Sequence, residues 1–218
     1  MQCKKITSTR EQMLDPAGAE WSNIPGESLK MDATPLANQP SEYIKASRDA
    51  KQIGKVKSLM VQTAHNGSDV FFRLTWQDDS QNMEITDTNM FPDGCGILIP
   101  LNGGDPPIDE MGSKDVPVNA WFWRADLKDV PHNTVARGLG TTLFSKKCPI
   151  QTKSLWGQGA WAVVFARLLA VPDQKDEAVQ LAPGGAVKIG FAVWEGSNGE
   201  RAGVKSFSKE WRDLTLEA

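Results

Sequence analysis

A β-hairpin signal in the first third of the 218-residue chain limits its possible folds more than any other feature. Residues 56–64 and 70–76 are rich in β-branched and aromatic residues, and Asn66-Gly67-Ser68 stands between them. Because Asn and Gly adopt positive φ at low cost, such a turn between two strand-like runs is typical of a hairpin. We therefore expect antiparallel strands here.

Further stretches have the same strand-like composition, whereas helical periodicity is weak. They are residues 96–101, 118–125, 161–170, 186–195 and 211–216. Connections 102–117 and 127–159 exceed the usual loop length, and residues 1–50 look like an irregular lead-in with scattered prolines. The sequence predicts an all-β fold, an antiparallel β-sandwich with long loops and few short helices. We expect one domain over residues 1–218.

Composition excludes several classes of function. A net charge of −3 gives no basic stripe for nucleic acid or anionic lipid. No apolar run approaches the roughly 20 residues that span a bilayer, and the first residues lack the apolar stretch of a secretory signal, which by itself favours the cytoplasm. Three scattered cysteines, Cys3, Cys95 and Cys148, are too few for a disulfide framework or a zinc or iron–sulfur site.

A series of short motifs carries a family resemblance over roughly residues 21–216. In order they are Ala64-His65-Asn66-Gly67-Ser68, Phe72-Arg73-Leu74-Thr75-Trp76, Phe91-Pro92-Asp93-Gly94-Cys95-Gly96, Met111-Gly112, Pro117-Val118-Asn119-Ala120-Trp121-Phe122-Trp123-Arg124-Ala125, Gly159-Ala160-Trp161, Arg167, and the stretch from Val187 to Ser206. In this order and spacing they resemble the γ subunit of ethylbenzene dehydrogenase. Its relatives are the haem b subunits of periplasmic molybdenum enzymes acting on dimethyl sulfide, selenate and chlorate.

The resemblance implies a haem b electron-transfer subunit that is not itself a catalyst. In such complexes a molybdenum-containing α subunit acts on the substrate, and an iron–sulfur β subunit passes electrons to the γ haem. The haem exchanges them with a soluble partner such as a cytochrome c. The resemblance also implies a periplasmic location, reached by export together with a signal-bearing partner.

The resemblance further implies a methionine and a lysine as axial ligands of the haem iron. Met111 lies in an acidic, proline-rich loop without an obvious core partner, and a thioether is a soft ligand that raises the haem potential. For the amine we place Lys188 first, because alternation sets it on one strand face with Gly190, Ala192 and Trp194. Lys205 is the second choice. Either of the two histidines, His65 or His132, could replace the lysine.

Other residues are candidates to surround the porphyrin. The small residues Gly190 and Ala192 leave room for a flat macrocycle, and Trp121 and Trp123 share one strand face that either joins the core or walls the pocket. Arg124 is a candidate partner for the propionates, as are Arg137, Arg167 and Lys153.

A second function from a different class stays open. Eight tryptophans on short strands could form a stacking platform for sugar rings, as in a carbohydrate-binding β-sandwich module without haem. An active site is not indicated, because the chain shows no nucleophile near a base, no clustered carboxylates at ligand spacing and no glycine loop for phosphate.

Overall fold

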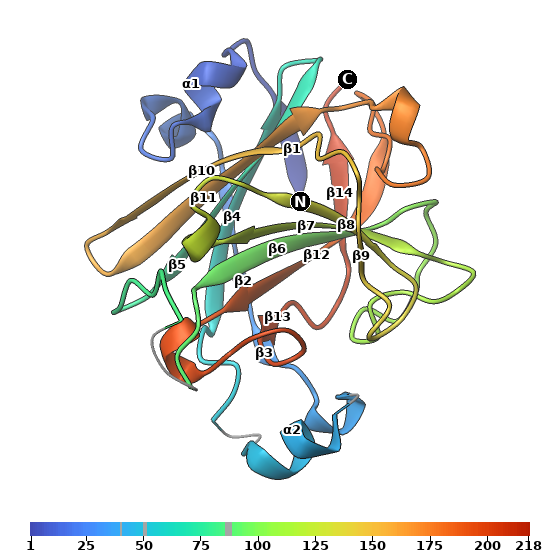
Figure 1. The fold of residues 1–218 in the computed structure, drawn as a ribbon. Helices are drawn as coiled ribbons and strands as arrows, with labels where there is room; N and C mark the ends of the chain where they lie inside the picture. Colours follow the sequence, from blue (N-terminus) through green and yellow to red (C-terminus); the bar gives the residue numbers. More distant parts are fainter. Residues whose placement is uncertain (40, 50–51, 86–88) are drawn as a thin grey trace.

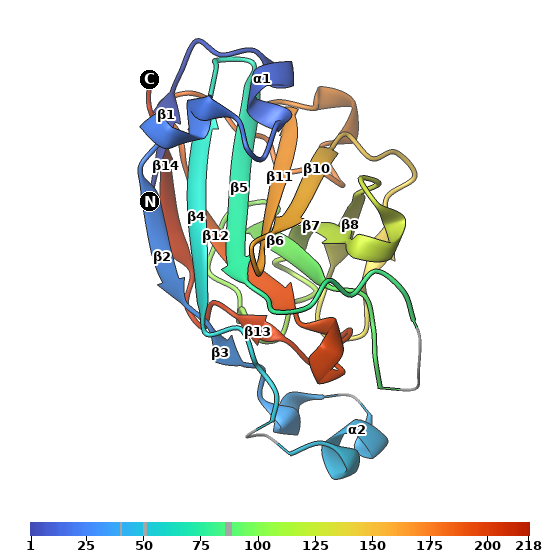
Figure 2. The same ribbon diagram turned by 90° about the vertical axis from the view of Figure 1, so that its left-hand side faces the viewer.

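Two β-sheets face one another across a shared core in the computed structural model, which describes residues 1–39, 41–49, 52–85 and 89–218 (Figures 1 and 2). The strands are β1 (Gln2–Lys5), β2 (Gly26–Lys30), β3 (Asp32–Ala33), β4 (Ser58–His65), β5 (Asp69–Gln77), β6 (Gly94–Pro100), β7 (Val118–Arg124), β8 (His132–Ala136), β9 (Leu143–Phe144), β10 (Gln151–Gly157), β11 (Ala160–Leu168), β12 (Ala186–Trp194), β13 (Ser206–Phe207) and β14 (Arg212–Leu216). The described α-helices are α1 (Arg10–Leu14) and α2 (Glu42–Ser47).

The first sheet has the order β10-β11-β5-β4, with β2 paired along the far edge of β4. The second has the order β14-β12-β6-β7-β8-β9, and β13 also pairs with β12. Strand β1 pairs in parallel with both β4 and β14 and so joins the two sheets. The other strand pairs are antiparallel.

Alternation of apolar and smaller or polar residues decides which side of each strand enters the core. In β7, Trp121 and Trp123 are fully buried between the sheets, while Ala120, Phe122 and Arg124 lie on the opposite face. Trp121 meets Phe72 of the first sheet edge-on at a centroid distance of 5.6 Å. Burying such aromatic side chains is a main source of the stability of a sandwich.

The N-terminal segment covers the outer face of the first sheet. Helix α1 begins at a capping box, in which Thr9 and Gln12 bond each other's backbone, and it presents Met13 to the sheet. Met13 and Trp21 pack with Phe71 and Val164 in a second apolar cluster. Of the two described α-helices, α1 packs on strands β5 and β11 of the first sheet, and α2 packs on the short turn over Leu36–Asn38.

The expected hairpin and strands are confirmed, with small changes at their ends. Strands β4 and β5 form the hairpin, and Asn66 Oδ1 closes its turn by accepting hydrogen bonds from the backbone N–H groups of Ser68 and Asp69. The strands expected around residues 96–101, 118–125, 161–170, 186–195 and 211–216 are β6, β7, β11, β12 and β14.

The two segments expected to be irregular contain strands, so that prediction was wrong in part. Residues 1–50 include β1, β2 and β3, and residues 127–159 include β8, β9 and β10. Strands β2, β9 and β10 lie at sheet edges and expose much of their length, and β1 and β8 have only four and five residues. Both features weaken the hydrophobic signal. Pro40, within the expected lead-in, lies outside the described residues.

Two observations concern features expected of the whole chain. In the part of the chain that the structure describes, no helix is both long and apolar enough to cross a bilayer. Cys3, Cys95 and Cys148 are all free thiols, and the first two are buried.

Candidate functional site

The centre of the outer face of the second sheet is formed mostly by small residues, which occupy neighbouring positions on three strands. The register pairs Gly190 with Leu98 and Leu98 with Ala120, and it pairs Ala192 with Gly96. Gly94 follows on the same face, opposite Trp194. We call Gly94, Gly96, Leu98, Ala120, Gly190 and Ala192 the floor residues.

Aromatic rings stand at one end of this floor. The indole of Trp194 lies against Gly94 and Gly96, since a Cβ added at either glycine would be 3.6 Å from the ring. Phe122 meets Trp194 edge-on at 5.0 Å and stacks with His132 at 6.4 Å, and His132 meets Phe144 at 4.9 Å. The outer face therefore has a centre of mostly small residues and an apolar, aromatic end.

Lys205 brings an amine to the aromatic end of the face. It immediately precedes β13, whose pairing of Ser206 with Val193 places Lys205 beside Trp194. Its Nζ lies 5.4 Å from the Trp194 ring centroid, and only 8% of the residue is exposed. Within the described residues, Lys205 Nζ donates one hydrogen bond, a long one of 3.5 Å to the Ala202 carbonyl. No described carboxylate forms an ion pair with Nζ.

Burial without a counter-ion changes the chemistry of this amine. Removal from water disfavours the ammonium form, and burial lowers the pKa of Lys205 to about 8. A neutral amine has a free lone pair, which is the form that can coordinate a metal ion.

Met111 lies in a loop that packs against the other end of the floor. Ile108 of this loop covers Gly190, where an added Cβ would be 2.6 Å from Ile108 Cδ1. The Trp211 indole donates a hydrogen bond of 2.7 Å to the Pro106 carbonyl, and Met111 accepts one of 3.2 Å from the Gly138 N–H. Met111 is half-buried and has a φ of 56°, in the left-handed region that few residues other than glycine adopt. Such a conformation in an anchored loop is often found at functional sites.

Lys188 lies in a different environment from Lys205, although it shares the face of Gly190 and Ala192 as expected. Its Nζ is 3.8 Å from Asp105 and 3.7 Å from Asp213, and about a third of its side chain is exposed. The amine thus forms ion pairs with two carboxylates near the surface. Lys188 therefore has the surroundings of a surface ion pair.

The remaining candidates divide between the two faces. Trp121 and Trp123 face the core, so the site on the outer face does not include them. Arg124 lies on the outer face but pairs with Asp126, and its Nε donates a hydrogen bond of 2.6 Å to that carboxylate. Arg167 is fully buried against Trp121, and His65 is buried in β4. Arg137 and Lys153 are exposed to solvent.

The meeting of three residues on this face was not predicted from the sequence. Phe122, Trp194 and His132 come together from β7, β12 and β8, which are distant in the chain. Their alternation with core residues was the available signal, because it sets Phe122 opposite to Trp121 and Trp123.

Comparison with known proteins decides the family of the chain. Residues 17–142 and 142–206 match the sequence pattern described as ethylbenzene dehydrogenase. The chain belongs to the ethylbenzene dehydrogenase family. Both candidate ligands Met111 and Lys205 lie within the matched residues.

The sequence is also similar to named subunits of oxidoreductases. It is 34% identical to the chlorate reductase subunit gamma of Ideonella dechloratans, over 91% of this chain and 78% of that protein. It is 31% identical to a protein of Haloferax mediterranei named as a respiratory nitrate reductase haem subunit, over 92% of this chain and 67% of that protein. It is 26% identical to the dimethylsulfide dehydrogenase subunit gamma of Rhodovulum sulfidophilum, over 90% of this chain and 73% of that protein.

Solved structures with a similar fold are carbohydrate-binding proteins. One from Bacteroides uniformis aligns over 100% of this chain and 98% of its own, with a TM-score of 0.61 and 11% identity. At this identity the likeness shows the shared β-sandwich only. The alternative of a sugar-stacking platform is also weakened by burial, since Trp21, Trp76, Trp121, Trp123 and Trp161 are buried and the other tryptophans are half-buried.

Proposed function

We propose that this chain is a haem b electron-transfer subunit of a molybdenum oxidoreductase complex, with Met111 and Lys205 as the axial ligands of the iron. The observation that carries the proposal is the Lys205 amine, which is buried beside Trp194 without an acidic partner. The match of the chain to the family pattern and its similarity to subunits of oxidoreductases support the same conclusion.

The chemistry of the two donor atoms supports a haem iron. Apart from Leu98, the floor residues have no side chain beyond a methyl group, and the Trp194 and Phe122 rings lie beside them. Burial favours the neutral amine of Lys205, and the soft sulfur of Met111 favours reduced iron. When bound, the haem supplies an iron centre that takes up and releases one electron at a time.

Lys205 replaces Lys188 as the preferred amine ligand in this proposal. Ligation by Lys188 would require its amine to leave the ion pairs with Asp105 and Asp213. His132 is also on the outer face and stays an alternative ligand, although its ring stacks on Phe122. Arg124 would have to exchange Asp126 for a haem propionate.

The partners in this proposal are a molybdenum-containing α subunit, an iron–sulfur β subunit and a soluble electron acceptor such as a cytochrome c. Similarity to the gamma subunits of two oxidoreductases supports a complex of several chains. We place the complex in the periplasm, as the family resemblance implies. The role of this chain is to hold the iron, exclude water from it and set its potential.

Substitution of each ligand by leucine tests the proposal, because leucine keeps apolar volume and provides no donor atom. We expect Met111→Leu to lower the midpoint potential or to lose haem, and Lys205→Leu to lose haem or to shift the Soret band. Haem content per chain and the visible spectrum of the reduced protein measure both effects.

Lys188→Leu is the matched control, since it removes an amine from the same face and leaves the proposed ligands intact. We expect its haem content and spectrum to equal those of the unmodified chain. Unchanged spectra in Lys205→Leu together with a changed spectrum in Lys188→Leu would contradict the assignment of the amine. A purified chain that binds no haem would contradict the function itself.

A further inference from the structure

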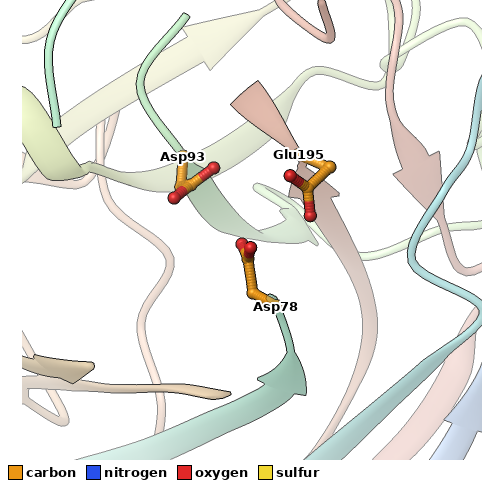
Figure 3. A group of neighbouring side chains, drawn as sticks. All are labelled: Asp78, Asp93 and Glu195. Atoms are coloured by element: carbon orange, nitrogen blue, oxygen red, sulfur yellow. The ribbon is translucent and has the colours of Figure 1, made fainter. Parts of the chain in front are cut away.

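Three carboxylates from separate segments meet inside the molecule, where Asp93 precedes Gly94 and Glu195 follows Trp194 in the sequence. Asp78 follows β5, Asp93 precedes β6 and Glu195 follows β12, and Figure 3 shows their side chains directed toward one another. One oxygen of each lies within 4.8 Å of the others. Asp78, Asp93 and Glu195 are 2%, 0% and 1% exposed, so water does not screen their charges.

Hydrogen bonds satisfy Asp93 but leave part of Asp78 without a partner. Asp93 accepts from the Gly196 N–H at 2.8 Å, the Asn82 N–H at 2.8 Å and the Trp161 indole at 3.0 Å. Asp78 Oδ1 accepts from the Ser80 N–H at 3.0 Å, whereas no N–H or O–H group of the described residues donates to the buried Asp78 Oδ2. Such an oxygen, directed at two other carboxylates, is costly unless a proton or a cation lies between them.

The described residues supply little positive charge to this group. Among the described residues, one ion pair reaches this group and joins Lys55 Nζ to Glu195 Oε1 at 4.0 Å, and half of the Lys55 side chain is exposed. Without a cation, burial and the neighbouring carboxylates raise the pKa of Asp78 to about 7 and that of Asp93 to about 6. In the described part of the chain, the group therefore combines three buried acids with one half-exposed amine at its edge.

We propose that Asp78, Asp93 and Glu195 form a structural calcium site. Carboxylate oxygens are hard donors that select Ca²⁺ or Mg²⁺ over the softer transition metals. Ca²⁺ accepts several protein oxygens in irregular geometry, whereas Mg²⁺ prefers to keep several of its waters in a strict octahedron. A nearly dry site that offers three carboxylates favours Ca²⁺.

The site would join two connections between strands. Asp78 and Asp93 bracket the connection from β5 to β6, and Glu195 begins the one from β12 to β13. The two connections already approach closely at Gly196, where an added Cβ would be 1.7 Å from the Phe91 carbonyl oxygen. The calcium site concerns residues other than the haem ligands, so either proposal can fail while the other holds.

Binding of calcium to the full-length chain tests this inference. After treatment with EDTA and its removal, we expect the chain to bind one Ca²⁺ by isothermal titration calorimetry. With Ca²⁺ at about a hundred times the dissociation constant, we expect Tm to rise by roughly 5 °C or more. Tb³⁺ should bind in the same place and emit on tryptophan excitation, because the Trp161 indole contacts Asp93.

Asp78→Asn and the exposed neighbour Asp79→Asn form a matched pair of variants. We expect Asp78→Asn to lose the calcium response and to be at least as stable as the unmodified chain in EDTA, because one of the clustered charges is gone. Asp79→Asn should keep the full response. If Asp78→Asn does not fold, Glu195→Gln and the calorimetry of the unmodified chain still decide the question.

Three results would overturn the proposal. The first is an unmodified chain whose Tm is the same in Ca²⁺ and in EDTA and which binds no Ca²⁺. The second is a calcium response that survives both Asp78→Asn and Glu195→Gln, which would place the ion elsewhere. The third is a response to Mg²⁺ equal to that to Ca²⁺, which would contradict the choice of cation. Haem content measured on the same samples separates these outcomes from the haem proposal.

Discussion

Asn119 illustrates how one buried polar side chain fixes the edge of the second sheet. Its Oδ1 accepts hydrogen bonds from the Trp121 indole at 3.0 Å and from the Val179 N–H at 3.3 Å. Its Nδ2 donates to Asn133 Oδ1 at 2.7 Å and to the Thr134 carbonyl at 3.0 Å. The amide thus joins β7 to β8 and to the segment before β12, because both its oxygen and its nitrogen form hydrogen bonds.

Replacement of Asn119 by leucine should destabilise the fold. The change leaves the Trp121 and Val179 donors buried without an acceptor, and each such group costs about 1–3 kcal/mol. We expect Asn119→Leu to lower the free energy of unfolding by roughly 3 kcal/mol, measured by urea denaturation of the haem-free chain. A loss below about 1 kcal/mol would mean that water or a shifted backbone satisfies these donors.

At the scale of the element, strands β6 and β12 each pack one face into the core and contribute the opposite face to the proposed haem site. Cys95, Ile97 and Ile99 of β6 enter the core, while its glycines form part of the floor. A side chain at Gly96 would meet both the Trp121 carbonyl at 3.1 Å and the Trp194 ring at 3.6 Å. The small-residue surface of the floor therefore depends on the absence of a Cβ at this position.

Gly96→Leu should displace Trp194 and fill the floor, with loss of haem. Gly157→Leu is the control, because Gly157 ends β10 and has no atoms within 4 Å of a built Cβ. We expect haem content well below that of the unmodified chain for Gly96→Leu and an unchanged content for Gly157→Leu. Full haem loading of a folded Gly96→Leu variant would show that the macrocycle does not lie against this face.

The strand pattern predicted the elements with strong alternation and missed those without it. The hairpin, β6, β7, β11, β12 and β14 follow from β-branched and aromatic residues at alternating or buried positions. The strand β10 reads Gln151-Thr152-Lys153-Ser154, and its polar residues gave no hydrophobic signal. Edge and solvent-facing strands depend on pairing partners that are distant in the sequence, so local composition does not predict them.

The sequence predicted which strand face the residues of the candidate site occupy, but not which other residues they contact. Alternation placed Lys188, Gly190, Ala192 and Trp194 on one face of β12, as the structure has them. The carboxylates of Asp105 and Asp213 near Lys188, and the burial of Lys205 beside Trp194, come from loops and pairings that a strand pattern does not contain. For the same reason the meeting of Asp78, Asp93 and Glu195 was missed.

At the scale of the whole molecule, the fold separates stability from the proposed function. The aromatic core lies between the sheets, whereas the floor residues, Met111 and Lys205 lie outside it. This chain shares its β-sandwich fold with a carbohydrate-binding protein at 11% identity. The same fold can therefore host different functions. Loss of an axial ligand should therefore remove haem from a chain that stays folded.

X-ray absorption at the iron edge tests the central claim most directly, because it reports the atoms bound to the iron. For the haem-loaded chain we predict one sulfur scatterer in addition to nitrogen, and its loss in Met111→Leu. In Lys205→Leu we predict the sulfur to remain and one nitrogen ligand to be lost or replaced by water. Iron bound only by nitrogen in the unmodified chain would contradict ligation by Met111.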